Sequence, residues 1–199
     1  LGGLWCSFSW SHIGPPEPFL GLLLAVAVVD SLSAQLSPED SSRVKIKWPN
    51  DLLIDSAKFG GILTEAQCQG QRTDFFFGLG LNLAFSTEKL AELPASSLAS
   101  TSFFSKFAKS PSPKEAIFDI LPRFEQLLLA DRKQRETGLQ KVKARMSTLG
   151  QQISWEAENT PRQIGQAISL ADDGALQVRD AQGQIQILHA GEVRHLRDH

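Results

Sequence analysis

The feature that most constrains this chain is an apolar run of eleven residues, Phe19–Val29, broken only by Gly21. Pro18 is well placed to start a helix, so the sequence predicts a mostly buried helix over Phe19–Leu36. The run is shorter than the ~20 residues that a membrane helix needs. A helix this apolar has to be covered by other elements of a globular domain, and we expect no membrane span.

Alternating or continuous apolar patterns predict strands on both sides of this helix. In the first of these segments, Leu4, Cys6, Phe8 and Trp10 share one face. The predicted strands are Gly2–Trp10, Arg43–Trp48, Leu52–Asp55, Lys58–Gln67 and Asp74–Phe85. The sequence therefore predicts four or five strands around one buried helix.

The following hundred residues divide into a helical part and a strand-rich part. Helical spacing predicts a helix over Lys114–Ala130, which Pro122 should kink or divide, and a polar helix over Arg132–Leu149. After Gly150, alternation predicts four short strands, Ile153–Ala157, Gln163–Leu170, Ala175–Arg179 and Gln184–Leu188. Asp173-Gly174 and Gln182-Gly183 separate them at hairpin spacing. We therefore expect two domains, residues 1–149 and a small β-barrel over residues 150–199.

Composition excludes several classes of function. The net charge is −2 and the calculated pI is near 6.1, so broad attraction to nucleic acid or to anionic membranes is not expected. Cys6 and Cys68 are the only cysteines and have no metal-ligand spacing, which favours reduced thiols. Since no signal peptide is evident, a cytoplasmic location is expected.

Three short motifs between Lys45 and Asn82 carry the candidate chemistry. Lys47–Asp51 reads Lys-Trp-Pro-Asn-Asp, Lys58–Glu65 reads Lys-Phe-Gly-Gly-Ile-Leu-Thr-Glu, and Gly78–Asn82 reads Gly-Leu-Gly-Leu-Asn. A lysine offers a point charge to a carboxylate or phosphate. Strand glycines let a ligand lie against the backbone. The three motifs together predict a site for an anion beside an apolar body.

Each feature alone has a plainer interpretation. A lysine at a turn is usually solvated, glycines in strands often mark bulges, and Asn-Asp after proline is a common turn. Trp48 and Ile62 could be ordinary core residues. The functional interpretation depends on the order and spacing of the three motifs.

In that order and spacing, the motifs closely resemble those of the biotin–protein ligase family. The resemblance extends with less force to Gly3–Trp10 and to the terminal Gly191–Val193 with Arg197. It implies an α+β fold in which a mixed, mainly antiparallel sheet of the class II synthetase and biotin ligase type packs against helices. A small SH3-like β-barrel would follow it. The implied activity is the formation of biotinoyl-5'-AMP from biotin and Mg-ATP, then transfer of biotin to a lysine of a biotin carboxyl-carrier protein.

The resemblance also implies roles for individual residues. Lys58 would bridge the biotin carboxylate and the α-phosphate, and Asp51 would orient the acceptor lysine. The implied biotin-binding residues are Lys58, Gly61, Ile62, Leu63, Gly78 and Gly80. The implied adenylate-binding residues are Asn50, Asn82 and Arg197, although Arg194 and His195 do not match the family's usual Gly-Glu-Val-Ser-Leu-Arg run. Magnesium would arrive with ATP rather than in a cage made by the protein.

The sequence departs from the family at its start. A Gly-Arg-Gly-Arg-x-Gly-Arg loop and a Ser-Thr-Asn segment should precede Leu1, and the only methionine is Met146. We therefore expect an N-terminal part to be missing. A non-catalytic module that binds biotin or a partner remains an alternative, as does a lipoate–protein ligase, against which the Lys-Trp-Pro-Asn-Asp run argues. Pairing of two copies through sheet edges fits the resemblance, and nothing in the sequence decides it.

Overall fold

The computed structural model describes residues 2–91, 98–156, 161–189, 191 and 193–196. Its larger sheet has five antiparallel strands in the order β1-β5-β4-β3-β2. The bounds are β1 Gly3–Ile13, β2 Val44–Lys47, β3 Asp51–Ile54, β4 Ala57–Gln69 and β5 Arg72–Asn82. The predicted mainly antiparallel α+β fold is therefore confirmed for this part of the chain.

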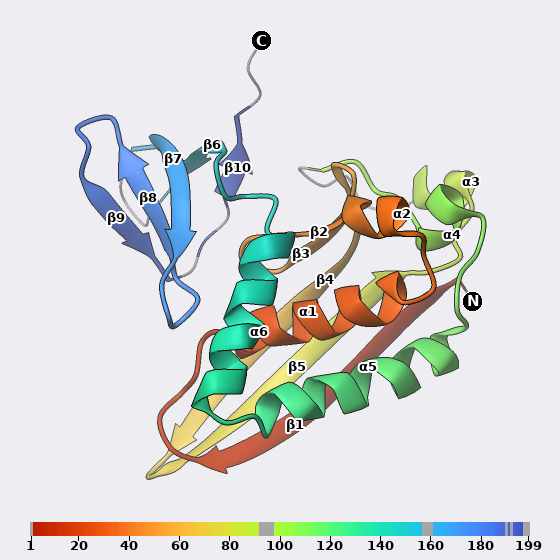
Figure 1. Ribbon diagram of the computed structural model, residues 1–199, viewed down its shortest axis with the longest axis horizontal. Helices are drawn as coiled ribbons and strands as arrows, with labels where there is room; N and C mark the ends of the chain where they lie inside the picture. The colour runs from red at the N-terminus through yellow and green to blue at the C-terminus, as the bar shows by residue number, and fades with distance from the viewer. Residues whose placement is uncertain (1, 92–97, 157–160, 190, 192, 197–199) are drawn as a thin grey trace.

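Three helices lie on one face of this sheet (Figure 1). Helix α1, Leu20–Ser33, packs against the sheet and against the helices α5, Pro113–Leu128, and α6, Arg132–Arg145, which also contact the sheet. Twelve of the fourteen residues of α1 are buried, as its all-round apolar sequence predicts. The helices leave the opposite face of the sheet open to solvent.

The alternation of β1 assigns its side chains to these two faces. Leu4 is buried and Phe8 and Trp10 are half-buried toward the helices, while Trp5 is 60% exposed on the open face. The predicted division of the strand into two faces is confirmed. Large aromatic side chains therefore contribute to both the core and the open face.

Pro122 does not divide its helix. Of the two effects that we expected, a kink or a division, the division was wrong. Helix α5 runs without interruption through Pro122. Proline removes one backbone hydrogen bond, and the carbonyl that loses its partner belongs to Phe118. The side chain of Phe118 is 69% exposed, so this carbonyl lies on the solvent side of the helix, where water can replace the lost donor.

Three short helices connect the larger elements. Helix α2, Pro38–Arg43, was not expected, because a proline followed by two acidic residues is typical of a break between elements. Pro38 is instead the first residue of α2, and Ser37 caps the helix by accepting the Asp40 N–H at 3.1 Å. The other two are α3, Thr87–Ala91, and α4, Phe103–Phe107.

The second sheet also has five antiparallel strands, in the order β10-β6-β7-β8-β9. The bounds are β6 Gln152–Trp155, β7 Gln163–Leu170, β8 Leu176–Asp180, β9 Ile185–Leu188 and β10 Val193–His195. Four of these strands were predicted and β10 was missed. Because β9 and β10 do not pair in the described part of the chain, closure into an SH3-like barrel stays a prediction.

Hydrogen bonds join the two sheets where α6 leads into β6. The Ser147 N–H donates to the Ile46 carbonyl at 2.7 Å, and the Trp48 indole N–H donates to the Gly174 carbonyl at 3.1 Å. Trp48 is 2% exposed, so its ring is part of the shared core. None of the described helices is both long and apolar enough to cross a membrane.

Candidate active site

One row of residues crosses all five strands of the larger sheet. Strand register places Lys47 opposite Asp51, Asp51 opposite Gly61, Gly61 opposite Gly80, and Gly80 opposite Trp5. Residues directly opposite one another share a face of the sheet. The two glycines therefore leave a gap in the middle of the row, with charged groups on one side and an indole on the other.

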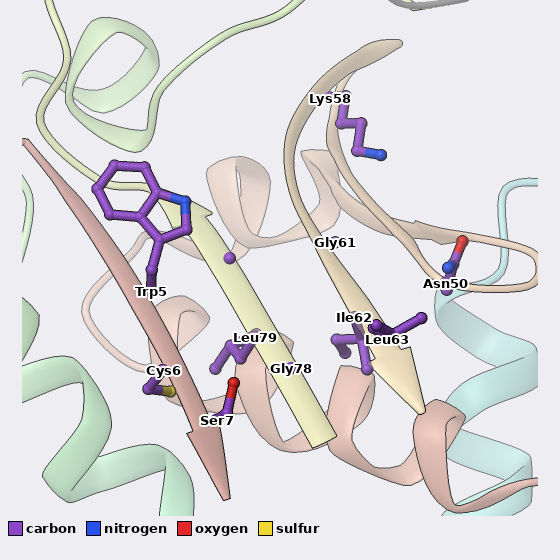
Figure 2. Close-up of a pocket in the computed structure, with 11 residues that line it drawn as sticks. Trp5, Cys6, Ser7, Asn50, Lys58, Gly61, Ile62, Leu63, Gly78 and Leu79 are labelled. Carbon is purple, nitrogen blue, oxygen red and sulfur yellow. The ribbon is translucent and has the colours of Figure 1, made fainter. Parts of the chain in front are cut away.

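This gap is part of an open pocket of about 520 Å³. Figure 2 shows Trp5 on β1 at one side of the pocket and Lys58 and Asn50 at the other. The pocket is lined by Trp5, Cys6, Ser7, Asn50, Lys58, Gly61, Ile62, Leu63, Gly78, Leu79 and Gly80. A pocket of this size, with an apolar floor and a few polar groups at one end, suits a small ligand that has an apolar body and an anionic end.

The glycines keep the floor of the pocket low. A Cβ at Gly80 would lie 3.4 Å from Cδ1 of Trp5, and one at Gly61 would lie 3.5 Å from Nζ of Lys58. Any longer side chain at either position would project between the indole and the ammonium. Leu63, which is 59% exposed, adds apolar surface beside this floor.

Lys58 reaches the pocket face because β4 contains a bulge. The register shifts between Leu52 and Leu53, so Leu52 pairs with Gly60 while Leu53 pairs with Lys58, and Phe59 is the extra residue. Phe59 and Gly60 both face the core. Regular alternation from Gly61 would have turned Lys58 toward the core as well. The bulge re-aims Lys58 onto the open face.

Asp51 lies between two ammonium groups. Its Oδ1 is 2.5 Å from Nζ of Lys58, and its Oδ2 is 3.4 Å from Nζ of Lys47. The side chains are 15%, 37% and 3% exposed for Asp51, Lys58 and Lys47, respectively. The three groups carry one net positive charge at the edge of the pocket.

The structure separates Asn82 from the other predicted site residues. Asn82 Nδ2 donates to the Thr101 carbonyl at 3.1 Å, and Asn82 is not among the residues that line the pocket. The segment that it holds runs beside β4, since the Thr101 N–H donates to the Lys58 carbonyl and the Lys58 N–H to the Ala99 carbonyl. Asn82 therefore supports the backbone of Lys58 through this segment.

The remaining predicted residues fall into three groups. Lys58, Gly61, Ile62, Leu63, Gly78, Gly80 and Asn50 line one pocket. Asp51 contacts Lys58 at its edge. Arg197 lies outside the described residues, so its role stays a prediction.

Sequence reasoning missed four lining residues: Trp5, Cys6, Ser7 and Leu79. Alternation in β1 had placed Trp5 and Ser7 on the face away from the core, which was the available signal. It could not show that this face borders the glycines of β5. Cys6 is half-buried, and this burial raises the pKa of its thiol. A thiol with a raised pKa is less reactive, so Cys6 is a structural residue of the pocket wall.

Two further hollows lie between the sheets. One of about 200 Å³ is bordered by Trp48, Asn50, Thr64 and Gly174. The other, about 1050 Å³, is bordered by Lys47 and by cationic residues of the second sheet. Burial, together with the charge of Lys47, lowers the pKa of His195 at the edge of the larger cleft.

The described residues contain no group of three or more histidine, cysteine or acidic side chains placed to hold a metal ion. Asn50 and Asp51 supply oxygen atoms next to the pocket, which is the donor type that magnesium prefers. Oxygen atoms of this type are compatible with a magnesium ion that is held mainly by other groups.

Comparison with protein-family models matches residues 2–82 to the biotin/lipoate A/B protein ligase family. The matched segment contains the whole cross-strand row and the residues that line the pocket. Residues 2–82 of the chain are therefore similar to this family.

Relatives with curated names extend the match along the chain. A biotin–[acetyl-CoA-carboxylase] ligase of Mycobacterium tuberculosis is 27% identical over 179 residues, which is 90% of this chain and 63% of that protein. Its counterpart in Paracoccus denitrificans is 29% identical over 180 residues, 87% of this chain and 71% of that protein. The chain thus spans a little under two thirds of the length of the first relative.

A solved structure has the same fold. Biotin protein ligase from Aquifex aeolicus in complex with biotin and ATP has a TM-score of 0.72 at 23% identity. The match covers 99% of this chain and 79% of that one. The likeness in fold therefore extends over both sheets.

Proposed function

We propose that this chain is the biotin- and ATP-binding part of a biotin–protein ligase. In the proposed reaction, biotin and ATP give biotinoyl-5'-AMP and pyrophosphate, and biotin then passes to a lysine of a biotin carboxyl-carrier protein. The observation that carries the proposal is the glycine gap between the Trp5 indole and the Lys58 ammonium. A small molecule with a ring and a carboxylate tail suits a gap that has an indole on one side and an ammonium on the other.

Lys58 is proposed to act in the first step. A biotin tail directed toward β4 brings its carboxylate to the Lys58 ammonium, which is 37% exposed and borders the pocket. A carboxylate oxygen then attacks the α-phosphorus, and the bond to the pyrophosphate oxygen breaks. A fixed cation stabilises the negative charge that builds on the phosphoryl oxygens. Trp5, Leu63, Gly78 and Gly80 would hold the ring while this happens.

Asp51 is proposed to act in the second step. In transfer, an amine of the carrier lysine attacks the acyl carbon, the bond to AMP breaks, and the amine loses a proton. A carboxylate beside Lys58 can attract and orient that amine. Asn50 at the pocket wall, with Asn82 and Arg197, remains proposed for the adenylate, and magnesium would be held through the phosphates.

The rest of the architecture fits the same proposal. Residues 1–149 would form the catalytic domain, and residues 150–199 would form the small SH3-like barrel that helps to recognise the carrier protein. Pairing of two chains through sheet edges and a cytoplasmic location are proposed on the family resemblance. β1 and β2, at the two ends of the described sheet, are the strands through which such pairing could occur.

Biotin-dependent exchange of pyrophosphate into ATP tests the proposal. The assay should use this chain and a version extended by whatever in-frame sequence precedes Leu1. We expect exchange with biotin, and loss of about 100-fold or more in Lys58→Ala, the size typical for removal of one group that stabilises developing charge. Lys114→Ala, on the far side of α5, is the matched control.

Each outcome discriminates between functions. Exchange with lipoate but not biotin would make the chain a lipoate ligase. A folded extended chain that binds biotin without exchange would make it a binding module. Asp51→Asn should slow transfer to the carrier more than exchange, and equal loss in both steps would assign Asp51 to the nucleotide or its metal instead.

A further inference from the structure

Lys47 is a buried ammonium whose function the proposed mechanism leaves open. It is the last residue of β2 and lies opposite Asp51 in the sheet register. Its side chain is 3% exposed, and its Nζ is 3.4 Å from Oδ2 of Asp51. A buried charge is costly unless it is paired. Lys47 therefore needs a carboxylate close by at all times.

The other side of Lys47 offers no replacement. It borders the cleft of about 1050 Å³, which also contains Arg162, Arg194 and His195. The carboxylate described in that cleft, Asp55, is already paired with Arg43 and Lys106. Within the described part of the chain, Asp51 is thus the counterion of Lys47.

Asp51 is shared unequally between its two lysines. The Lys58 ammonium is closer, with Nζ 2.5 Å from Oδ1 of Asp51, but Lys58 is 37% exposed and lines the pocket. Lys58 can turn from Asp51 toward a ligand, whereas Lys47 is buried and forms its described ion pair with Asp51. One of the two cations is free to leave the carboxylate, and the other has to stay.

We infer that Lys47 is a positioning residue that keeps Asp51 paired and in place when Lys58 moves to the anionic substrate. The inference rests on the proposed function, because it assigns Lys58 to the biotin carboxylate and Asp51 to the acceptor amine. With Lys47 present, Lys58 leaves behind a carboxylate that is still compensated. Without Lys47, Lys58 is the cation on which Asp51 depends, and each substrate anion has to compete with Asp51 for it.

A double-mutant cycle tests this division of roles. Lys47→Met removes the charge but keeps most of the side-chain length, and it is compared in the wild-type and Asp51→Asn backgrounds. In the wild-type background we expect KM for biotin in pyrophosphate exchange to rise about tenfold or more, the size expected for one charge-assisted hydrogen bond. In the Asp51→Asn background the same change should alter KM by less than about twofold, because the competition for Lys58 has gone.

The matched control is Lys45→Met, the same substitution two residues earlier on β2. Lys45 is half-buried and forms no ion pair among the described residues, so its variant should keep the wild-type KM. If Lys47→Met raised KM equally in the wild-type and Asp51→Asn backgrounds, the inference would be overturned, since a purely structural lysine does not depend on Asp51. An unchanged KM in Lys47→Met would overturn it as well.

A second measurement separates this inference from the proposed function. Acylation of Lys58 by sulfosuccinimidyl acetate, followed by peptide mass spectrometry, needs no substrate. We expect slower acylation in Lys47→Met, because Lys58 is held in its ion pair, and recovery in Lys47→Met with Asp51→Asn. If wild-type chain shows no exchange but this pattern holds, the ligase proposal fails and the pairing stands. If the wild-type chain shows exchange but this acylation pattern is absent, the ligase proposal stands and the inference about Lys47 fails.

Discussion

The hydroxyl of Thr148 accepts the backbone N–H of Trp48 at 3.0 Å, although the two residues lie 100 positions apart in the chain. Thr148 is fully buried where the second sheet meets the first. The bond fixes the backbone at the start of the Pro-Asn-Asp turn that leads to Asp51. Packing of the second sheet is therefore coupled to the geometry of the site.

Thr148→Val should lower the free energy of unfolding by about 1–3 kcal/mol. Valine has nearly the same shape as threonine but leaves the buried Trp48 N–H without an acceptor. Denaturant unfolding measures the effect, and Thr148→Ser, which keeps the hydroxyl, should recover most of the loss. Equal losses in the two variants would show that the methyl group, rather than the hydrogen bond, matters.

The pH dependence of stability should reflect His195, whose Nε2 lies 3.2 Å from the same Thr148 hydroxyl. Burial and Lys47 lower the pKa of His195 below the usual 6.5. The unfolded chain therefore takes up a proton at a higher pH than the folded chain does. The stabilisation is fully present above pH 6.5 and is lost as the pH falls through the lower folded pKa.

Thermal unfolding between pH 7.5 and 5 measures this effect. The contribution of His195 cannot exceed about 1.4 kcal/mol per pH unit, the limit for one proton. His195→Gln should flatten the curve below about pH 6.5. An identical pH dependence in wild type and variant would assign the acid sensitivity to other groups.

Trp5→Ala should weaken biotin binding by about 1–2 kcal/mol, as expected when one aromatic wall of a ligand pocket is removed. Trp5 is 60% exposed, and its ring packs on Phe85 with 5.6 Å between ring centroids. Titration calorimetry with biotin measures the loss. Ile13→Ala, at the far end of β1 and 74% exposed, is the matched control and should leave affinity unchanged. Unaltered affinity in Trp5→Ala would contradict the orientation proposed for the ring.

Two glycines on opposite faces of the sheet should respond differently to alanine. A Cβ at Gly60 would lie 2.7 Å from the Gly80 carbonyl oxygen and 2.6 Å from Cδ2 of Leu81, so Gly60→Ala should destabilise the fold by about 1–3 kcal/mol. A Cβ at Gly78 would lie 3.5 Å from Leu63, an ordinary contact. Gly78→Ala should keep the stability and reduce only ligand affinity. Urea unfolding and biotin titration of both variants separate the effects, and similar stability losses would refute the distinction.

Much of the fold follows from sequence periodicity. The buried helix α1, the faces of β1 and four strands of the second sheet were predicted because apolar spacing reports which side of an element meets the core. β10 was missed because three residues are too few to show a period. The prediction that Pro122 could divide its helix was wrong. Local propensity does not show whether the carbonyl that loses its hydrogen bond is exposed to water.

The site was predictable in its residue types but not in its geometry. Gly61, Gly78, Gly80 and Lys58 were expected together from their motifs, and they line one pocket. The contribution of Trp5 depends on which strand pairs with β5, a long-range choice that periodicity does not encode. The burial of Lys47 could not be predicted from the sequence either, because alternation in β2 puts its side chain on the face opposite the core residues Val44 and Ile46.

The bulge in β4 makes the chemistry of the site depend on the number of residues in two paired strands as well as on their kinds. One residue inserted between Leu52 and Leu53 would give Phe59 a partner and keep every charged and glycine residue of the row. Regular pairing would then direct the Lys58 side chain to the helix-covered face of the sheet, among the aliphatic side chains of the core. A homologue or a designed variant could thus retain all three motifs and still be inert. Alignment gaps of one position at these strands are therefore more informative about activity than most substitutions around the pocket.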